Sequence, residues 1–159
     1  MIIGLTGSIA SGKSTIADMI RNMGLPIVDA DLVARQVVEV GSPTLAKIVE
    51  EFGQEILLST GEMDRAKVGA IIFNDEQKRL KLNSIIHPAI RVEMIRQRDA
   101  YVGEGKHVVM DIPLLFESKL QHLVDKILVV TVSPDVQLQR LMTRNNLSKE
   151  EAEARIASQ

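Results

Sequence analysis

One stretch near the N-terminus, Gly7-Ser8-Ile9-Ala10-Ser11-Gly12-Lys13-Ser14, constrains the fold more than any other part of the sequence. It matches the pattern G-x-x-x-x-G-K-[ST], in which backbone N–H groups surround a phosphate and the following helix adds the positive end of its dipole. The apolar run 2–6 precedes the match, and an amphipathic segment follows from Lys13 to about Met23. Because the match lies between a strand and a helix, it predicts a nucleoside-triphosphate site rather than an incidental glycine turn.

This phosphate loop also predicts the roles of its residues. Lys13 is expected to contact the β- and γ-phosphates and to act in catalysis, while the Ser14 hydroxyl is expected to bind Mg²⁺. Asp111, which ends a later strand, is expected to be a second contributor to the metal site. The loop does not define the phosphate acceptor. The predicted nucleotide-binding residues are Gly7, Ser8, Ile9, Ala10, Ser11, Gly12, Lys13, Ser14 and Thr15.

The remaining apolar runs predict an α/β fold with a long insertion. Gly24 is placed as a helix C-cap, and strands are expected at 26–28, 107–111 and 126–132. Between Asp31 and His107 the chain advances by 76 positions (107 − 31 = 76), whereas a parallel crossover needs only about a dozen residues. An inserted unit must therefore occupy this part of the chain.

Capping residues predict that the insertion is helical. Ser42 and Pro43 are expected to begin a helix that ends at Phe52, and Asp64 and Asp75 are expected to cap two more. A fourth helix is expected to follow His87-Pro88 and to run to about Val102. Beyond the fourth strand, Ser133-Pro134 predicts a helix to about Arg144, and Ser148 with Glu151 forms a capping box for a last one.

Two large classes of phosphate-loop proteins fit poorly. Switch GTPases need a guanine-reading motif after a later strand, and Ser133-Pro134-Asp135 does not supply it. Motor and transport ATPases carry an acidic pair at the end of the third strand, but here Ile112-Pro113 follows Asp111. A compact kinase of a small metabolite remains.

Two aspartates follow the second predicted strand. Ligands of open α/β sheets bind outside the carboxyl ends of the strands, so a carboxylate there could accept the proton of an attacking hydroxyl. Asp31 is the expected catalytic residue, whereas Asp29 is expected mainly to cap the helix that starts near Leu32.

The composition of the chain limits which binding partners and which cellular compartment are expected. The 19 Lys and Arg residues against 21 Asp and Glu residues give a net charge of -2, so no overall positive field favours nucleic acid. Cysteine is absent, which excludes disulfides and thiolate zinc sites. No apolar run approaches the roughly 18 residues of a membrane span. We expect a soluble, cytoplasmic protein with no membrane partner. The sequence leaves the oligomeric state open, and a monomer is the favoured state.

Six blocks together resemble one family, the dephospho-coenzyme A kinases. They are LTGSIASGKST (5–15), VDAD (28–31), ARQVVEVGSPTL (34–45), HPAI (87–90), DIPLLFE (111–117) and QLQRLMTRNNLSKEEAEARIASQ (137–159). The first block is common to phosphate-loop kinases, but the ordered combination is specific and spans essentially the whole chain.

The resemblance implies an enzyme that uses ATP and Mg²⁺ to phosphorylate the ribose 3′-hydroxyl of dephospho-coenzyme A. It implies one P-loop domain, 1–159, of three α/β/α layers, with a mostly parallel sheet of order 2-3-1-4-5, a helical acceptor-binding insertion at 32–104 and a lid at 140–159. Family members continue past Gln159 with a further strand, so we expect this chain to lack the fifth one.

The resemblance also assigns residues. Asp31 matches the proposed catalytic base and Arg140 the lid-side arginine that binds phosphate, while the acceptor-binding matches are Asp31, His87, Pro88, Leu114, Leu115 and Glu117. Alternatives stay open at several of these positions. His87 could pack locally at a helix start, the two leucines could be core, and Arg140, Arg144 and Arg155 could be solvated. A kinase of another small acceptor, such as a nucleoside monophosphate, and a nucleotide-binding module without metabolite kinase activity are the competing functions.

Overall fold

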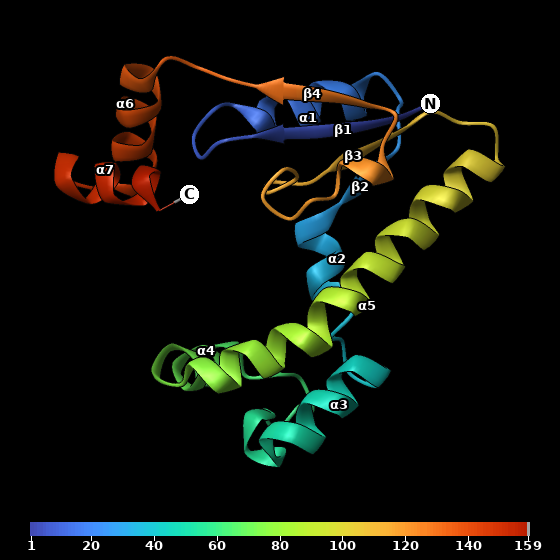
Figure 1. Ribbon diagram of the computed structural model, residues 1–159, viewed down its shortest axis with the longest axis vertical. Helices are drawn as coiled ribbons and strands as arrows, with labels where there is room; N and C mark the ends of the chain where they lie inside the picture. Colours follow the sequence, from blue (N-terminus) through green and yellow to red (C-terminus); the bar gives the residue numbers. More distant parts are fainter. Residues whose placement is uncertain (159) are drawn as a thin grey trace. The chain divides into compact units, whose positions relative to one another are not determined.

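The computed structural model describes residues 1–158, which form two compact units. The sheet unit comprises Met1–Val28 and the chain from Arg98 onward, and the helical unit comprises Asp29–Gln97. Their elements can be followed by colour in Figure 1. No helix within residues 1–158 is long and apolar enough to cross a membrane.

A four-stranded sheet forms the centre of the sheet unit. Its strands are β1 (Ile2–Gly7), β2 (Ile27–Asp29), β3 (Val108–Asp111) and β4 (Lys126–Val130), in the order β2-β3-β1-β4. Strand β1 is parallel to β3, with Leu5 opposite Asp111, and parallel to β4, with Gly7 opposite Val130. The predicted α/β class and the order of the first four strands are confirmed.

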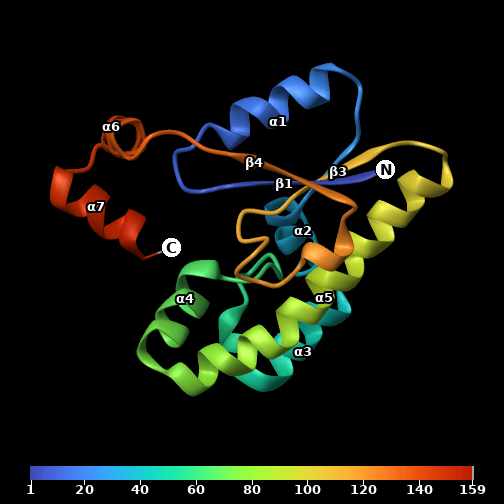
Figure 2. The ribbon, with the colours of Figure 1, turned by 45° about the horizontal axis from the view of Figure 1, so that its top comes forward.

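Three helices accompany this sheet: α1 (Lys13–Asn22), α6 (Pro134–Asn145) and α7 (Lys149–Ala157). Helix α1 packs Ala17 against Leu5 and Val109, and Figure 2 shows it lying along one side of the strands. The predicted caps of the other two are confirmed, because the Ser133 hydroxyl accepts from Val136 N at 3.3 Å and the Ser148 hydroxyl accepts from Glu151 N at 3.2 Å.

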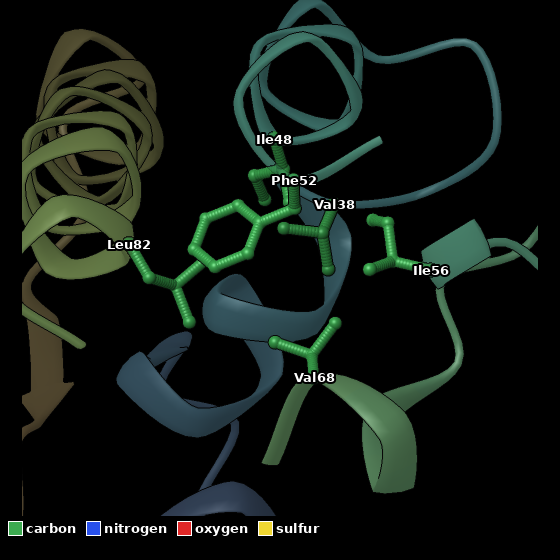
Figure 3. Packing of buried hydrophobic residues seen from close by; sticks show 6 residues of the cluster. All are labelled: Val38, Ile48, Phe52, Ile56, Val68 and Leu82. Atoms are coloured by element: carbon green, nitrogen blue, oxygen red, sulfur yellow. The ribbon is translucent and has the colours of Figure 1, made fainter. Parts of the chain in front are cut away.

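The helical unit contains α2 (Ala30–Gln36), α3 (Pro43–Phe52), a short 3₁₀ turn (Gln54–Ile56), α4 (Arg65–Asn74) and most of α5 (Glu76–Gly103). The predicted caps hold here as well: Ser42 accepts from Leu45 N, Asp64 from Lys67 N and Asp75 from Lys78 N. The core that these helices share consists of Val38, Ile48, Phe52, Ile56, Val68 and Leu82 (Figure 3). Apolar residues from α3, the 3₁₀ turn, α4 and α5, together with Val38 just after α2, thus meet in one cluster.

The predicted helix start at His87-Pro88 is wrong. Helix α5 runs unbroken for 28 residues with Pro88 inside it, so His87 lies in mid-helix. Proline removes one backbone hydrogen bond, which costs about 3 kcal/mol in a helix interior. Leu82, Ile85 and Ile86 pack in the core of the unit before the proline, and Met94 is buried after it. Burial on both sides of Pro88 offsets the lost bond.

A groove of about 1000 Å³ runs between α5 and the start of α3 within the helical unit. At its edge Gln97 donates to Gln36 Oε1 at 3.1 Å and to Glu93 Oε1 at 3.0 Å, which joins α5 to α2. Arg96 donates to both Glu93 oxygens, at 2.6 and 2.8 Å. The bonds from Arg96, and then from Gln97, lower the pKa of Glu93 to about 2.

The helical core should dominate the stability of its unit. Ile48 is fully buried, so we expect Ile48→Ala to lower the free energy of unfolding by about 2–5 kcal/mol, measured by urea denaturation. Leu80, on α5, is 50% exposed, and Leu80→Ala should change it by less than about 0.5 kcal/mol. Equal changes in the free energy of unfolding for the two substitutions would contradict the placement of Ile48 in the core.

Candidate active site

The phosphate loop lies between the end of β1 and the start of α1. Ser11 N donates to Ser8 O at 3.2 Å, which closes a turn inside the loop. Two residues adopt left-handed backbone conformations, Ala10 with φ 58° and Gly12 with φ 96°. Such a conformation costs a non-glycine residue about 1–2 kcal/mol, so contacts around the loop must hold Ala10 in place.

Gly7 is required for space and not for conformation. A Cβ atom at this position would lie 2.7 Å from the backbone oxygen of Val130 and 2.6 Å from Ser11 Oγ. Because the parallel partner β4 supplies that oxygen, the end of β1 can approach β4 only without a side chain.

The Ser11 hydroxyl bears on what the loop binds. It is buried, and among the side chains of residues 1–158 its oxygen is the buried polar atom that makes no hydrogen bond. Buried polar groups are normally satisfied, so one left over in a loop of this kind fits a site that a phosphate completes. Ser14 and Thr15, on the first turn of α1, are exposed.

Lys13 forms an ion pair with Asp111. The side chains are 17% and 8% exposed, so the pair lies largely out of water. It joins the start of α1 to the end of β3, and Thr6 Oγ1, which donates to Pro113 O at 3.1 Å, ties the neighbouring backbone together. The predicted catalytic lysine and the predicted metal-site carboxylate are therefore side by side.

Helix α6 contacts the same loop through two side chains. Arg140 Nη1 donates to Ser11 O at 3.3 Å, so the predicted lid arginine lies at the loop. Gln137 Nε2 donates to Ser8 Oγ at 3.1 Å and to Ile9 O at 2.8 Å. We did not predict Gln137 as a site residue, because a glutamine in a helix carries no sequence signal. Arg144, by contrast, is exposed and donates to the neighbouring Asn145 at 2.8 Å.

The segment after β3 has mixed burial. Leu114 and Glu117 are exposed, while Leu115 is fully buried and lies where a Cβ on Gly4 would approach its Cδ1 to 2.7 Å. The Leu115 side chain therefore packs in the core over β1. Leu114 and Glu117 keep side chains that a ligand could reach.

The other predicted acceptor-side residues belong to the helical unit. Asp29 caps α2, because its Oδ1 accepts from Asp31 N at 2.9 Å and from Leu32 N at 3.3 Å. Asp31 is exposed in the first turn of that helix. His87 and Pro88 are exposed on α5. The structure thus gathers the loop, Lys13, Asp111 and Arg140 in the sheet unit, with Asp31, His87 and Pro88 in the helical unit.

The parallel sheet and the phosphate loop between β1 and α1, with Lys13 at the start of the helix, define a P-loop nucleotide-binding protein. The family model of dephospho-CoA kinase matches residues 1–159. The chain belongs to the dephospho-CoA kinase family, and the resemblance drawn from its motifs is confirmed.

Individual relatives agree with the family model. Dephospho-CoA kinases of Bacillus anthracis and Geobacillus kaustophilus are 59% and 56% identical over 160 aligned positions, which cover 100% of this chain and 80% of each relative. A solved dephospho-CoA kinase from Campylobacter jejuni has a TM-score of 0.75 at 32% identity, covering 99% of this chain and 79% of that one. A Thermus thermophilus structure has a TM-score of 0.78 at 31% identity, over 100% and 80%.

The close contacts around Gly7 predict that a side chain at this position would weaken ATP binding. In Gly7→Ala the new methyl must displace Ser11 or the end of β4, so we expect ATP to bind about tenfold more weakly or worse in titration calorimetry. The matched control is Gly69→Ala in α4, where an added Cβ meets nothing within 4 Å. ATP affinity that is unchanged in Gly7→Ala would refute the role given to this contact.

Proposed function

We propose that this chain transfers the γ-phosphoryl group of ATP to the ribose 3′-hydroxyl of dephospho-coenzyme A through the site built on the phosphate loop. Membership of the family identifies a kinase with ATP as the donor and dephospho-coenzyme A as the acceptor. The observation that supports this site most strongly is the loop itself, with its unsatisfied Ser11 hydroxyl beside Lys13. The 3′-oxygen forms a bond to the γ-phosphorus, the bond to the β–γ bridging oxygen breaks, and ADP leaves.

Lys13 is proposed to change partner when the nucleotide binds. Its ammonium is a compact charge on a flexible stem, so it can leave Asp111 for the more highly charged phosphate oxygens. There it offsets the negative charge of the transferring group, which is the main requirement of phosphoryl transfer. Arg140, one helical turn beyond Gln137 on α6, is proposed to leave Ser11 O and add a second positive charge.

The residues present fit a magnesium ion. Mg²⁺ prefers oxygen ligands and keeps several waters, and the Ser14 hydroxyl and Asp111 carboxylate supply oxygens of the required kind. Within residues 1–158 no cluster of three His, Cys, Asp or Glu side chains could hold a metal without the nucleotide. We therefore propose that Ser14 and Asp111 hold an ion that also binds ATP. Such an ion would neutralise phosphate charge.

Asp31 is the proposed acceptor of the hydroxyl proton. The Asp29 carboxylate already accepts two backbone N–H groups, which fits it to a structural role. Asp31 lies two residues beyond the end of β2, and its side chain is exposed to an incoming ligand. His87, Pro88, Leu114, Leu115 and Glu117 stay proposed acceptor-side residues, with Leu115 acting from the core.

The acceptor can be tested directly. In a coupled assay of ADP release, dephospho-coenzyme A should raise turnover far above that with ATP alone, while nucleoside monophosphates should not. Mass spectrometry and cleavage by a 3′-nucleotidase would place the new phosphate. Equal kcat/KM for a nucleoside monophosphate, or no stimulation by dephospho-coenzyme A, would refute the proposed acceptor.

Substitutions of Asp31 and Asp29 should have different effects on turnover in the same assay. We expect Asp31→Asn to lower kcat by about 10²–10⁴-fold, since the amide cannot take the proton, with ATP affinity nearly unchanged. Asp29→Asn keeps an oxygen that can cap α2, so its loss of kcat should be at least about tenfold smaller. Wild-type turnover in Asp31→Asn would remove Asp31 from the mechanism.

A further inference from the structure

Gln137 makes contacts with the phosphate loop that the proposed chemistry does not use. Its side chain is buried, and the partner at 2.8 Å is a backbone carbonyl, Ile9 O, which can only accept. The contacting atom must therefore be the amide nitrogen, and its second hydrogen is directed to Ser8 Oγ at 3.1 Å. Both donor positions of one buried amide are thus used on two consecutive residues of the loop.

These bonds fix the direction of a peptide plane. A trans peptide holds the C=O of one residue antiparallel to the N–H of the next, and no peptide bond within residues 1–158 is cis. When Gln137 holds the Ile9 carbonyl, it also sets the direction of the Ala10 N–H. Ala10 has φ 58°, a conformation that the chain does not favour without support.

The same helix repeats the arrangement one turn later. Arg140 Nη1 donates to Ser11 O at 3.3 Å, which orients the peptide that carries the Gly12 N–H. Leu141, which follows Arg140 on α6, is fully buried. Arg140 must leave Ser11 O if it is to reach the phosphates. Gln137 is uncharged, so the phosphates do not draw it away from Ser8 and Ile9.

We propose that Gln137 is a positioning residue for ATP: it holds Ser8 and Ile9 so that the loop amides face the phosphates before the nucleotide arrives. The inference rests on the proposed nucleotide site and adds a residue to it. Its effect is on ATP binding, because it orients the groups that grip the phosphates and touches neither the acceptor nor the transferred group.

Gln137→Met tests this directly, since methionine keeps the length and bulk but has no N–H. Loss of two neutral hydrogen bonds should weaken ATP binding about 5- to 30-fold in titration calorimetry without acceptor. The KM for ATP should rise by a similar factor, with the KM for dephospho-coenzyme A within about twofold of wild type. Amide hydrogen exchange across residues 8–12 should become faster.

Gln137→Asn is the second variant. It keeps an amide but shortens the side chain by one methylene, so it cannot reach Ile9 O and should lose as much ATP affinity as Gln137→Met. The matched control is Gln139→Met on the exposed side of the same helix, which should leave ATP affinity within about twofold.

Three results would overturn the inference. One is wild-type ATP affinity in either Gln137 variant, and another is an equal loss in Gln139→Met. The third is a parallel rise in both KM values together with a lower thermal midpoint, which would show ordinary packing. ATP binding is measured without acceptor. If dephospho-coenzyme A failed as a substrate, the proposed function would be refuted, but the ATP affinities of the Gln137 variants could still be interpreted.

Discussion

The parallel pairing of β1 with both β3 and β4 is the constraint on which the site depends. It brings the carboxyl ends of three strands to one edge of the sheet, although β1 and β3 lie about a hundred residues apart in sequence. Lys13 reaches Asp111 because one follows β1 and the other ends β3. The close approach of Gly7 to Val130 depends on the same pairing. A parallel sheet therefore builds the phosphate site before any side chain contributes chemistry.

Local signals in the sequence predicted most of the elements. Ser42, Ser133 and Ser148 cap the helices that they were expected to cap, because a cap acts within three residues of itself. The continuous helix α5 was missed at Pro88, since the packing that carries the helix through the proline comes from residues distant in sequence. Local chemistry is readable from the chain alone, whereas tertiary burial is not.

The candidate active site also contains residues that local sequence signals predict and residues that only tertiary contacts reveal. The loop motif predicted roles for Lys13, Ser14 and the surrounding glycines, because their spacing is dictated by the size of a phosphate. Gln137 could not be found in this way. Its importance comes from meeting Ser8 and Ile9 across 128 or more residues of sequence, and a glutamine within a helix is ordinary. Leu115 lies in a block that resembles the family, yet its side chain is buried in the core. A motif can therefore include residues that support the site by packing.

The pair Asp29 and Asp31 shows how one short motif can divide structural and chemical work. Asp29 is the last residue of β2 and also the N-cap of α2, so it fixes the point at which strand becomes helix. Its carboxylate accepts two backbone N–H groups, so its side chain is already used in the cap. Asp31 donates its backbone N–H to that cap, which leaves its exposed carboxylate available for chemistry. The cap therefore orders the backbone of the residue proposed to act as base, without occupying its side chain.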